Sequence, residues 1–135
     1  CFDTSYVNLL QYYYLKQNNL NVGFSKKNNF YLLSNLKNNK DYFLSNNFKY
    51  TFIANWSLSE TPIKFRKKFY NLIKNSELIL ICFQEKFEKI NNLKYFANIK
   101  KKLSHNFKIK IIKNEFYKGN IFNPQKHYFF IGKKL

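Results

Sequence analysis

The sequence is poor in cysteine and glycine, and this excludes several classes of protein. Its 2 cysteines cannot make the framework of a disulfide-rich domain. Its 3 glycines exclude a collagen-like or flexible-linker chain and leave little material for a glycine-rich phosphate loop. The longest apolar run, residues 78–83, is far shorter than the roughly 20 residues of a membrane span. No secretory signal is expected either, because no charged start leads into an apolar segment and a cleavage site.

Acidic residues are also scarce. The chain has 24 Lys and Arg against 7 Asp and Glu, a formal net charge of +17. Lys, Asn, Phe, Tyr, Ile and Leu dominate, which indicates an A/T-rich gene of the kind that organelles carry, so abundant lysine alone says little. The scarcity of acids has no such origin, because Asp and Glu codons are not G/C-rich. The charge therefore predicts a polyanionic partner. Nucleic acid is the first candidate, and an anionic membrane surface is the second. The alternative is an ordinary solvated lysine surface, although such surfaces normally intersperse acids.

Length and apolar content fit one folded domain over residues 1–135, since the chain is 45% hydrophobic. Apolar periodicity predicts helices at 4–17, 28–39, 59–74 and 86–103, and extended segments at 20–24, 42–45, 50–54, 77–83, 107–112 and 128–131. Strands that alternate with helices are typical of α/β folds. We therefore predict an α/β protein, a single three-layer domain with a mostly parallel sheet flanked by helices.

No combination of residues predicts an active site. His105 and His127 stand far from any cysteine, so no Cys/His spacing fits zinc. Cys82 lies within an aliphatic segment and is expected to be a small core residue. Glu85 and Glu88 are expected at the start of a helix, where they would interact favourably with its dipole. We therefore predict no catalytic residue, no metal, no cofactor and no small-molecule substrate.

Aromatic and basic side chains provide the candidate RNA contacts. Most of the 16 Phe and 11 Tyr are expected in the core, because Val and Ala are scarce, whereas those beside lysine are candidates to stack on bases. Trp56 fits either role. Arg66 stands alone among lysines, and a guanidinium can grip a phosphate bidentately; the alternative is an ordinary cation on a helix surface. The predicted RNA-contacting residues are Lys26, Lys27, Lys49, Asn55, Trp56, Lys64, Arg66, Lys67 and Lys68.

The order of several short motifs resembles the small-subunit ribosomal protein S-two family. The segment 2–10 resembles that family's helix opening, and Val22-Gly23-Phe24-Ser25-Lys26 resembles its Val-Gly-Thr-Lys strand end. Residues 43–56 stand where the family has a strand and a glycine-rich turn that ends in Trp. The segments 76–81, 109–114 and 128–132 follow in the family's order. The likeness covers most of the chain, but Tyr50-Thr51 replaces the family's glycine pair.

This resemblance implies a structural constituent of the small ribosomal subunit, seated between its head and body. Such a protein binds ribosomal RNA (rRNA) and neighbouring ribosomal proteins and has no catalytic turnover. Together with the A/T-rich composition, it implies a mitochondrial ribosome, with a plastid-type organelle as the alternative. The segment from Asn46 to Trp56 is the turn expected to dock on RNA.

Three other interpretations stay open. Residues 77–116 resemble a strand-helix-strand segment of the large-subunit stalk-base protein L-ten, although that match leaves the first 60 residues unexplained. An RNA-processing enzyme would be favoured by converging carboxylates or a bound metal. A peripheral membrane protein or respiratory-complex subunit would be favoured by a lipid-facing stripe on residues 4–17.

Overall fold

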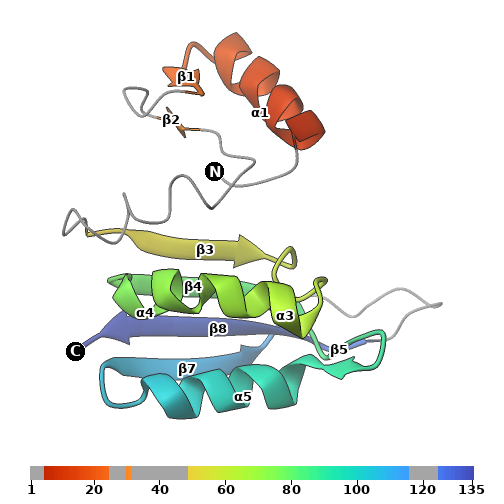
Figure 1. Cartoon of the computed structure of the whole chain (residues 1–135), viewed down its shortest axis with the longest axis vertical. Helices are drawn as coiled ribbons and strands as arrows, with labels where there is room; N and C mark the ends of the chain where they lie inside the picture. The colour runs from red at the N-terminus through yellow and green to blue at the C-terminus, as the bar shows by residue number, and fades with distance from the viewer. Residues whose placement is uncertain (1–4, 25–29, 32–48, 116–124) are drawn as a thin grey trace. The chain divides into compact units, whose positions relative to one another are not determined.

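A computed structural model provides the structure of the chain, and it describes residues 5–24, 30–31, 49–115 and 125–135. The chain divides into two units, Cys1–Asn46 and Asn47–Leu135, which are described separately. Figure 1 shows both units in the colours of the chain. The single domain over residues 1–135 stays a prediction.

The first unit contains one helix and a short pair of strands. Helix α1, Ser5–Gln17, lies within the predicted range 4–17. Two residues after its end, Asn19 has a φ of 57°, the left-handed conformation that closes many helices, and the Leu20 amide donates to the Leu15 carbonyl at 3.1 Å. Strand β1, Val22–Gly23, then pairs in parallel with β2, Phe30–Tyr31. The predicted helix 28–39 is thus wrong at β2, and residues 32–39 and 42–45 lie outside the described residues.

The second unit is built on one sheet of four strands in the order β3-β4-β8-β7. The strands are β3 Thr51–Asn55, β4 Leu78–Gln84, β7 Phe107–Lys113 and β8 His127–Lys134. Within this sheet only β3 and β4 pair in parallel, while β8 runs antiparallel to both β4 and β7. The positions of the strands were predicted well. The prediction of a mostly parallel sheet is wrong, because the sheet is mostly antiparallel.

The direction of β8 has a simple cause. Parallel neighbours need a long crossover, usually a helix, whereas a strand that returns through a loop pairs antiparallel. Helical segments connect β3 to β4 and β4 to β7, so these three strands share one direction. The sequence pattern placed no helix between 112 and 128. Strand β8 accordingly returns beside β7, with Tyr128 opposite Lys113, and lies between β7 and β4.

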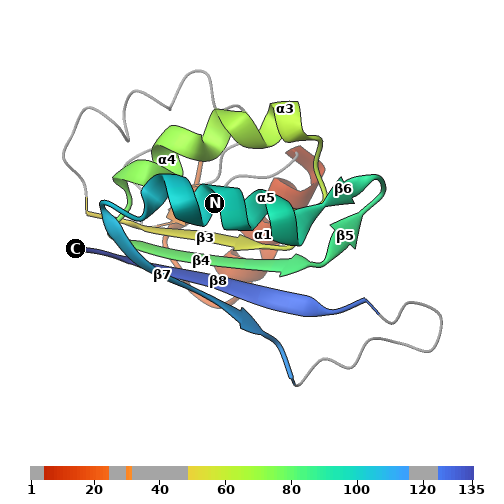
Figure 2. The same ribbon diagram turned by 90° about the horizontal axis from the view of Figure 1, so that it is seen from below.

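Helical segments of the second unit cover one face of this sheet (Figure 2), so this unit has two layers and not the three that were predicted. Helix α3, Ile63–Arg66, begins directly after Pro62, and proline favours the first turn of a helix. The same helical path continues through η1, Lys67–Phe69, and α4, Tyr70–Asn75. This confirms the core of the predicted helix 59–74, although no side chain caps its start. The Tyr50 hydroxyl donates to the Leu72 carbonyl at 2.6 Å and fixes α4 beside the start of β3.

The predicted helix 86–103 begins later than expected. Strands β5, Lys86–Phe87, and β6, Ile90–Asn91, form a small hairpin before helix α5, Asn92–Leu103. The Asn91 side chain accepts from the Lys94 amide at 2.8 Å and caps α5. Glu85 and Glu88 therefore stand before the helix rather than in its first turn, and their predicted interaction with the helix dipole is wrong.

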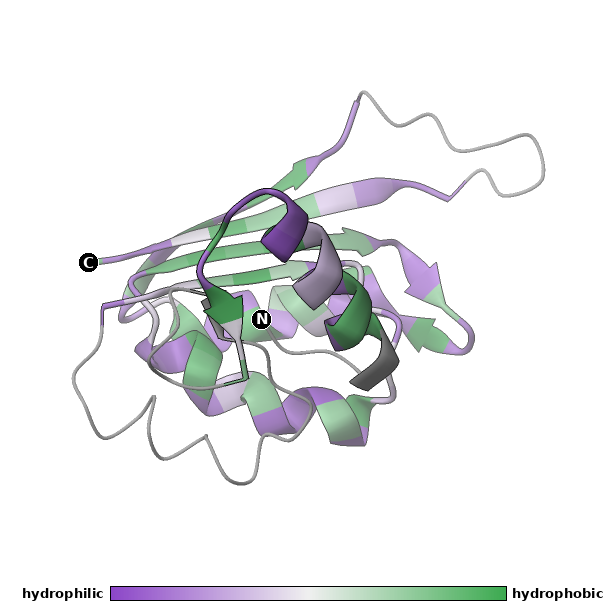
Figure 3. Cartoon of the chain, turned by 90° about the horizontal axis from the view of Figure 1, so that it is seen from above, coloured by the Kyte–Doolittle hydropathy of each residue, from purple (hydrophilic) through white to green (hydrophobic). Residues whose placement is uncertain are grey.

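The core lies between the helices and the sheet. Alternate residues of β4, Ile79, Ile81 and Phe83, are fully buried on the helix side. The ring of Phe96 from α5 lies 4.4 Å from that of Phe83 and 5.9 Å from that of Phe130, centroid to centroid. Figure 3 shows apolar residues along the central strands, and helices that alternate between polar and apolar positions.

The opposite face of the sheet keeps a group of exposed apolar side chains. Ile53, Leu78, Ile112 and Ile131 each expose between 42% and 60% of their surface. Cys82 alternates with the buried β4 residues and lies half-buried on this face, so its prediction as a core residue is wrong. Partial burial raises the pKa of its thiol, which keeps the thiol protonated at pH 7. No helix within the described ranges is long and apolar enough to cross a membrane.

Candidate functional site

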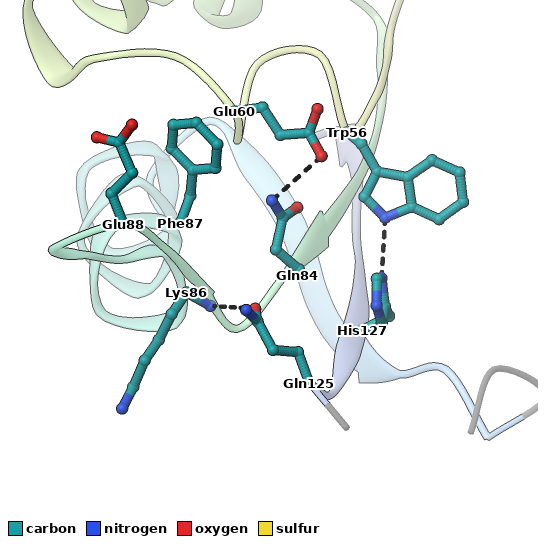
Figure 4. Close-up of a pocket in the computed structure, with 8 residues that line it drawn as sticks. All are labelled: Trp56, Glu60, Gln84, Lys86, Phe87, Glu88, Gln125 and His127. Carbon is teal, nitrogen blue, oxygen red and sulfur yellow. Dashed lines mark hydrogen bonds between the residues drawn. The ribbon is translucent and has the colours of Figure 1, made fainter. Parts of the chain in front are cut away.

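A pocket of about 590 Å³ opens at one edge of the four-stranded sheet. The carboxyl ends of the parallel strands β3 and β4 meet the amino end of antiparallel β8 at this edge. The β5–β6 hairpin forms the remaining wall. Figure 4 shows Trp56 and His127 on one side and Phe87 on the other, with Glu60 and Gln84 between them. The lining residues are Trp56, Glu60, Gln84, Lys86, Phe87, Glu88, Gln125 and His127.

Trp56 is held firmly although the residue is 40% exposed. Its φ of 53° is in the left-handed region, which costs free energy in a residue other than glycine. Its amide donates to the Cys82 carbonyl at 2.9 Å, and its carbonyl accepts from the Glu60 amide at 3.0 Å. The indole Nε1–H donates to Nδ1 of His127 at 2.9 Å. One edge of the indole is therefore fixed while part of its ring surface faces the solvent.

His127 is the acceptor in that bond, which defines its protonation state. Because Nδ1 accepts, the neutral ring carries its proton on Nε2. Burial lowers the pKa of His127, and the negative charge of Glu60 opposes this with a smaller rise. The imidazole is thus held neutral at pH 7, and protonation of Nδ1 would remove the acceptor of the indole.

Arg66 lies behind the pocket and is only 1% exposed. Its Nη1 donates to Oδ1 of Asn92 at 2.7 Å, its Nη2 to the Ser59 carbonyl at 2.6 Å, and its Nε to the Thr61 carbonyl at 2.7 Å. The guanidinium also lies 5.0 Å from the centroid of the Tyr95 ring. These acceptors are all neutral, and burial lowers the pKa of Arg66. Arg66 is therefore neither a surface cation nor positioned to grip a phosphate from solvent, because its donors are directed into the protein.

A chain of hydrogen bonds joins this buried cluster to the pocket. The amide of Asn92 donates to the Gln84 carbonyl at 2.9 Å. The hydroxyl of Ser59 lies 2.7 Å from the Trp56 carbonyl and 2.8 Å from Oε1 of Gln84, and its single proton is shared between these two acceptors. The amide nitrogen of Gln84 donates to Oε1 of Glu60 at 3.3 Å. Ser59 and Asn92 are fully buried, and Gln84 is 8% exposed. The buried cluster thus orients a carboxylate at the pocket.

The structure brings three of the predicted lysines together. Lys64, Lys67 and Lys68 are exposed and lie three and four residues apart along α3 and η1, so they share one side of this helical segment. The ammonium of Lys68 lies 5.5 Å from the centroid of the Phe65 ring. These lysines form a compact cationic row, which we call the α3–η1 lysine row.

The predicted docking turn from Asn46 to Trp56 is not a single turn. Residues 51–55 form strand β3, so exposed Lys49 and Asn55 stand at opposite ends of it, about 20 Å apart at ~3.3 Å per residue. Only Trp56 stands at the turn and lines the pocket. Lys26 and Lys27 lie outside the described residues.

Several residues of the pocket were not predicted from the sequence. No motif marks Glu60, Gln84 or His127. Their one common feature is their place near the ends of strands: Gln84 is the last residue of β4, His127 is the first of β8, and Glu60 follows β3. Arg66 gave a signal that was interpreted wrongly, because a lone arginine among lysines also suits a buried site that needs several donors in a fixed plane. Among the described residues, no three His, Cys, Asp or Glu side chains converge as a metal site would require.

Comparison with known proteins gave no match to a protein-family model, to a curated protein or to a solved structure. What the chain does must therefore be inferred from its own residues. The two features that carry chemistry are the lysine surface and the pocket at the sheet edge.

Proposed function

We propose that this chain is a structural, non-enzymatic constituent of an organellar ribosome. It binds rRNA of the mitochondrial small subunit and neighbouring ribosomal proteins, and so supports translation as a scaffold. The observation that carries this proposal is a lysine surface whose charge is left largely unneutralised by the chain itself. The assignment to the small subunit follows the motif resemblance to the S-two family.

The lysine surface extends over both layers of the second unit. Exposed lysines stand along α3 and η1, in the last turn of α5, and at alternate positions 108 and 110 of β7. Among the described residues, ion pairs join Lys113 to Glu115 at 3.1 Å and Lys134 to Glu77 at 3.3 Å, and the other lysines have no carboxylate within 4.0 Å. An ordinary lysine surface would intersperse acids among these positions. The remaining charge is available to a polyanion.

Phosphate is the natural partner for this charge. Each lysine that contacts a phosphate displaces condensed counterions, so the affinity depends steeply on salt and little on base sequence. The α3–η1 lysine row places three such charges within two helical turns. This mechanism requires docking and assembly but no bond-making step.

Protein neighbours are suggested by the opposite face of the sheet. Its exposed apolar residues, Ile53, Leu78, Ile112 and Ile131, lie in adjacent strands beside Lys108 and Lys110. Contiguous exposed apolar surface of this kind is typical of faces that other proteins cover.

The proposal is tested by measuring the affinity of the whole chain for a small-subunit rRNA fragment between 50 and 400 mM salt. We expect the logarithm of the association constant to fall linearly with the logarithm of salt, at roughly 0.7–0.9 per phosphate neutralised and thus with a slope of about −3 or steeper. Absence of binding at 50 mM salt, or a slope close to zero, would remove the basis of the proposal.

One observation favours a second candidate, a peripheral membrane protein. Helix α1 exposes Leu9, Leu10, Tyr13 and Tyr14, each between 57% and 69%, and these positions share one face. Flotation of the chain with anionic vesicles tests this candidate. This candidate would replace the ribosomal proposal if the chain binds the vesicles but does not bind RNA, and if the double variant Leu10→Gln with Tyr14→Gln no longer binds the vesicles.

A further inference from the structure

We propose that the pocket at the sheet edge binds one unpaired guanine base of the RNA, with the carboxylate of Glu60 as its reader. This inference rests on the proposed function, because it specifies which part of an RNA strand the chain recognises. The pocket has the size, the aromatic walls and the acceptor that a flipped-out guanine requires.

The first argument is the presence of acids where the chain otherwise avoids them. Only 7 residues of the chain are Asp or Glu, yet Glu60 and Glu88 line the same pocket. Neither carboxylate forms an ion pair with a described residue, although 24 Lys and Arg are present. A carboxylate repels phosphate but accepts hydrogen bonds, so a donor group on the edge of a base suits these two side chains better than the RNA backbone does.

The second argument is that the carboxylate of Glu60 is positioned in advance. The side chain of Gln84 is 8% exposed, its Oε1 lies 2.8 Å from the buried hydroxyl of Ser59, and its amide nitrogen donates to Oε1 of Glu60 at 3.3 Å. Guanine presents two adjacent donors, N1–H and the N2 amine, on its Watson–Crick edge. A carboxylate can accept from both at once, whereas adenine and uracil present a different pattern of donors and acceptors.

The third argument is the aromatic surface. Trp56 and Phe87 stand on opposite sides of the pocket, with Glu60 and Gln84 between them (Figure 4). The hydrogen bond from the indole to His127 fixes the edge of the Trp56 ring and leaves ring surface exposed. Proteins commonly recognise unpaired bases by stacking them on such rings while polar groups contact the base edge.

A cationic ligand, such as an arginine side chain of a neighbouring protein, also suits carboxylates beside aromatic rings. The net charge of +17 opposes the approach of any cation, whereas it attracts an RNA strand that carries a neutral base. Lys86 lines the pocket, and Lys126 is exposed beside it, since its carbonyl accepts from the Glu85 amide at 2.8 Å. Both lysines are therefore available to phosphates that flank such a base. The electrostatics therefore favour guanine.

The experiment uses the fluorescence of Trp56, the single tryptophan of the chain, as a probe within the pocket. The whole chain is titrated with GMP, IMP and AMP. We expect saturable quenching by GMP with an affinity at least about 10-fold above that of IMP, which lacks only the N2 amine, and above that of AMP. Glu60→Gln should remove this preference, whereas Glu115→Gln, an exposed carboxylate elsewhere, should retain it.

Equal affinities for GMP, IMP and AMP would overturn the inference, as would tighter binding of arginine amide than of GMP. If Glu60→Gln impairs folding, the comparison of GMP with IMP on the unaltered chain still decides the question. The rRNA salt titration is run on the same preparation. Salt-dependent RNA binding without guanine preference rejects the pocket alone, whereas guanine preference without RNA binding rejects the proposed ribosomal function.

Discussion

The cluster around Arg66 and the α3–η1 lysine row use positive charge in opposite ways, although they share one helical segment. Arg66 is 1% exposed and directs its guanidinium at neutral acceptors of the protein. Lys67 and Lys68, the next two residues, are exposed and have no carboxylate within 4.0 Å among the described residues. The arginine thus stabilises the sheet edge, and the lysines stay available for a polyanion. The comparison shows that a basic residue must be located before its charge is assigned to a partner.

The largest effect is expected when the buried charge is removed. Arg66→Met would leave the acceptors Ser59 O, Thr61 O and Asn92 Oδ1 without their donor. We expect the free energy of unfolding to fall by about 2–5 kcal/mol, measured by urea denaturation. The matched control is Lys67→Met at the adjacent exposed position, for which a change within about 0.5 kcal/mol is expected.

The RNA affinity of the folded Arg66→Met protein should change less than about 3-fold, since one buried charge makes no phosphate contact. If the Arg66→Met protein keeps its stability but loses RNA affinity more than 10-fold, Arg66 contacts RNA directly and this account of its role is wrong.

A smaller effect is expected at the surface. Replacement of Lys64, Lys67 and Lys68 by Gln should lower RNA affinity about 10- to 100-fold near 100 mM salt and reduce the salt slope by about 2–3. The stability should stay within about 0.5 kcal/mol, because these side chains are exposed. The control replaces Lys100, Lys101 and Lys102 of α5 in the same way. An equal loss in both triple variants would argue against a defined docking face at the α3–η1 row.

The smallest effect concerns pH and the edge of the pocket. The pKa of His127 is lowered by burial, so the unfolded chain binds more protons than the folded chain once the pH falls below about 6.5. Stability should therefore be full above that pH and decrease as the pH falls toward the lowered folded pKa. Protonation also breaks the bond from Trp56, so the tryptophan fluorescence should change over the same range.

His127→Gln keeps an acceptor for the indole but has no proton to gain, so it should remove this pH dependence. His105→Gln, at an exposed position after α5, should leave it in place. Identical pH profiles for the His127 variant and the unaltered chain would contradict the role assigned to this bond.

The positions of the main elements could be predicted because their apolar periodicity is local. Short segments carry this periodicity, as in the alternating burial of Ile79, Ile81 and Phe83 along β4 and in the apolar stripe of α5. The direction of β8 depends on its partners across the sheet, which no local pattern contains. The start of α5 was missed because the β5–β6 hairpin carries apolar Phe87 and Ile90 at spacings that continue the helical pattern.

The pocket was harder to predict than the fold. It joins residues 56–60, 84–88 and 125–127, which come together only through the register of the sheet. Trp56 was included among the candidate contacts, whereas Glu60 and Gln84 were not, because single polar residues after strands carry no recognisable motif. The burial of Arg66 depends on acceptors up to 26 residues away along the chain, such as Asn92.

The most direct test of the ribosomal proposal is the position of the chain in a sucrose gradient of lysate from the organelle in which we propose that it functions. We predict that it sediments with small ribosomal subunits, and that high salt, which screens lysine–phosphate contacts, releases it. Sedimentation with free proteins, with membranes or with large subunits alone would contradict the proposal that these lysines hold the chain on small-subunit rRNA.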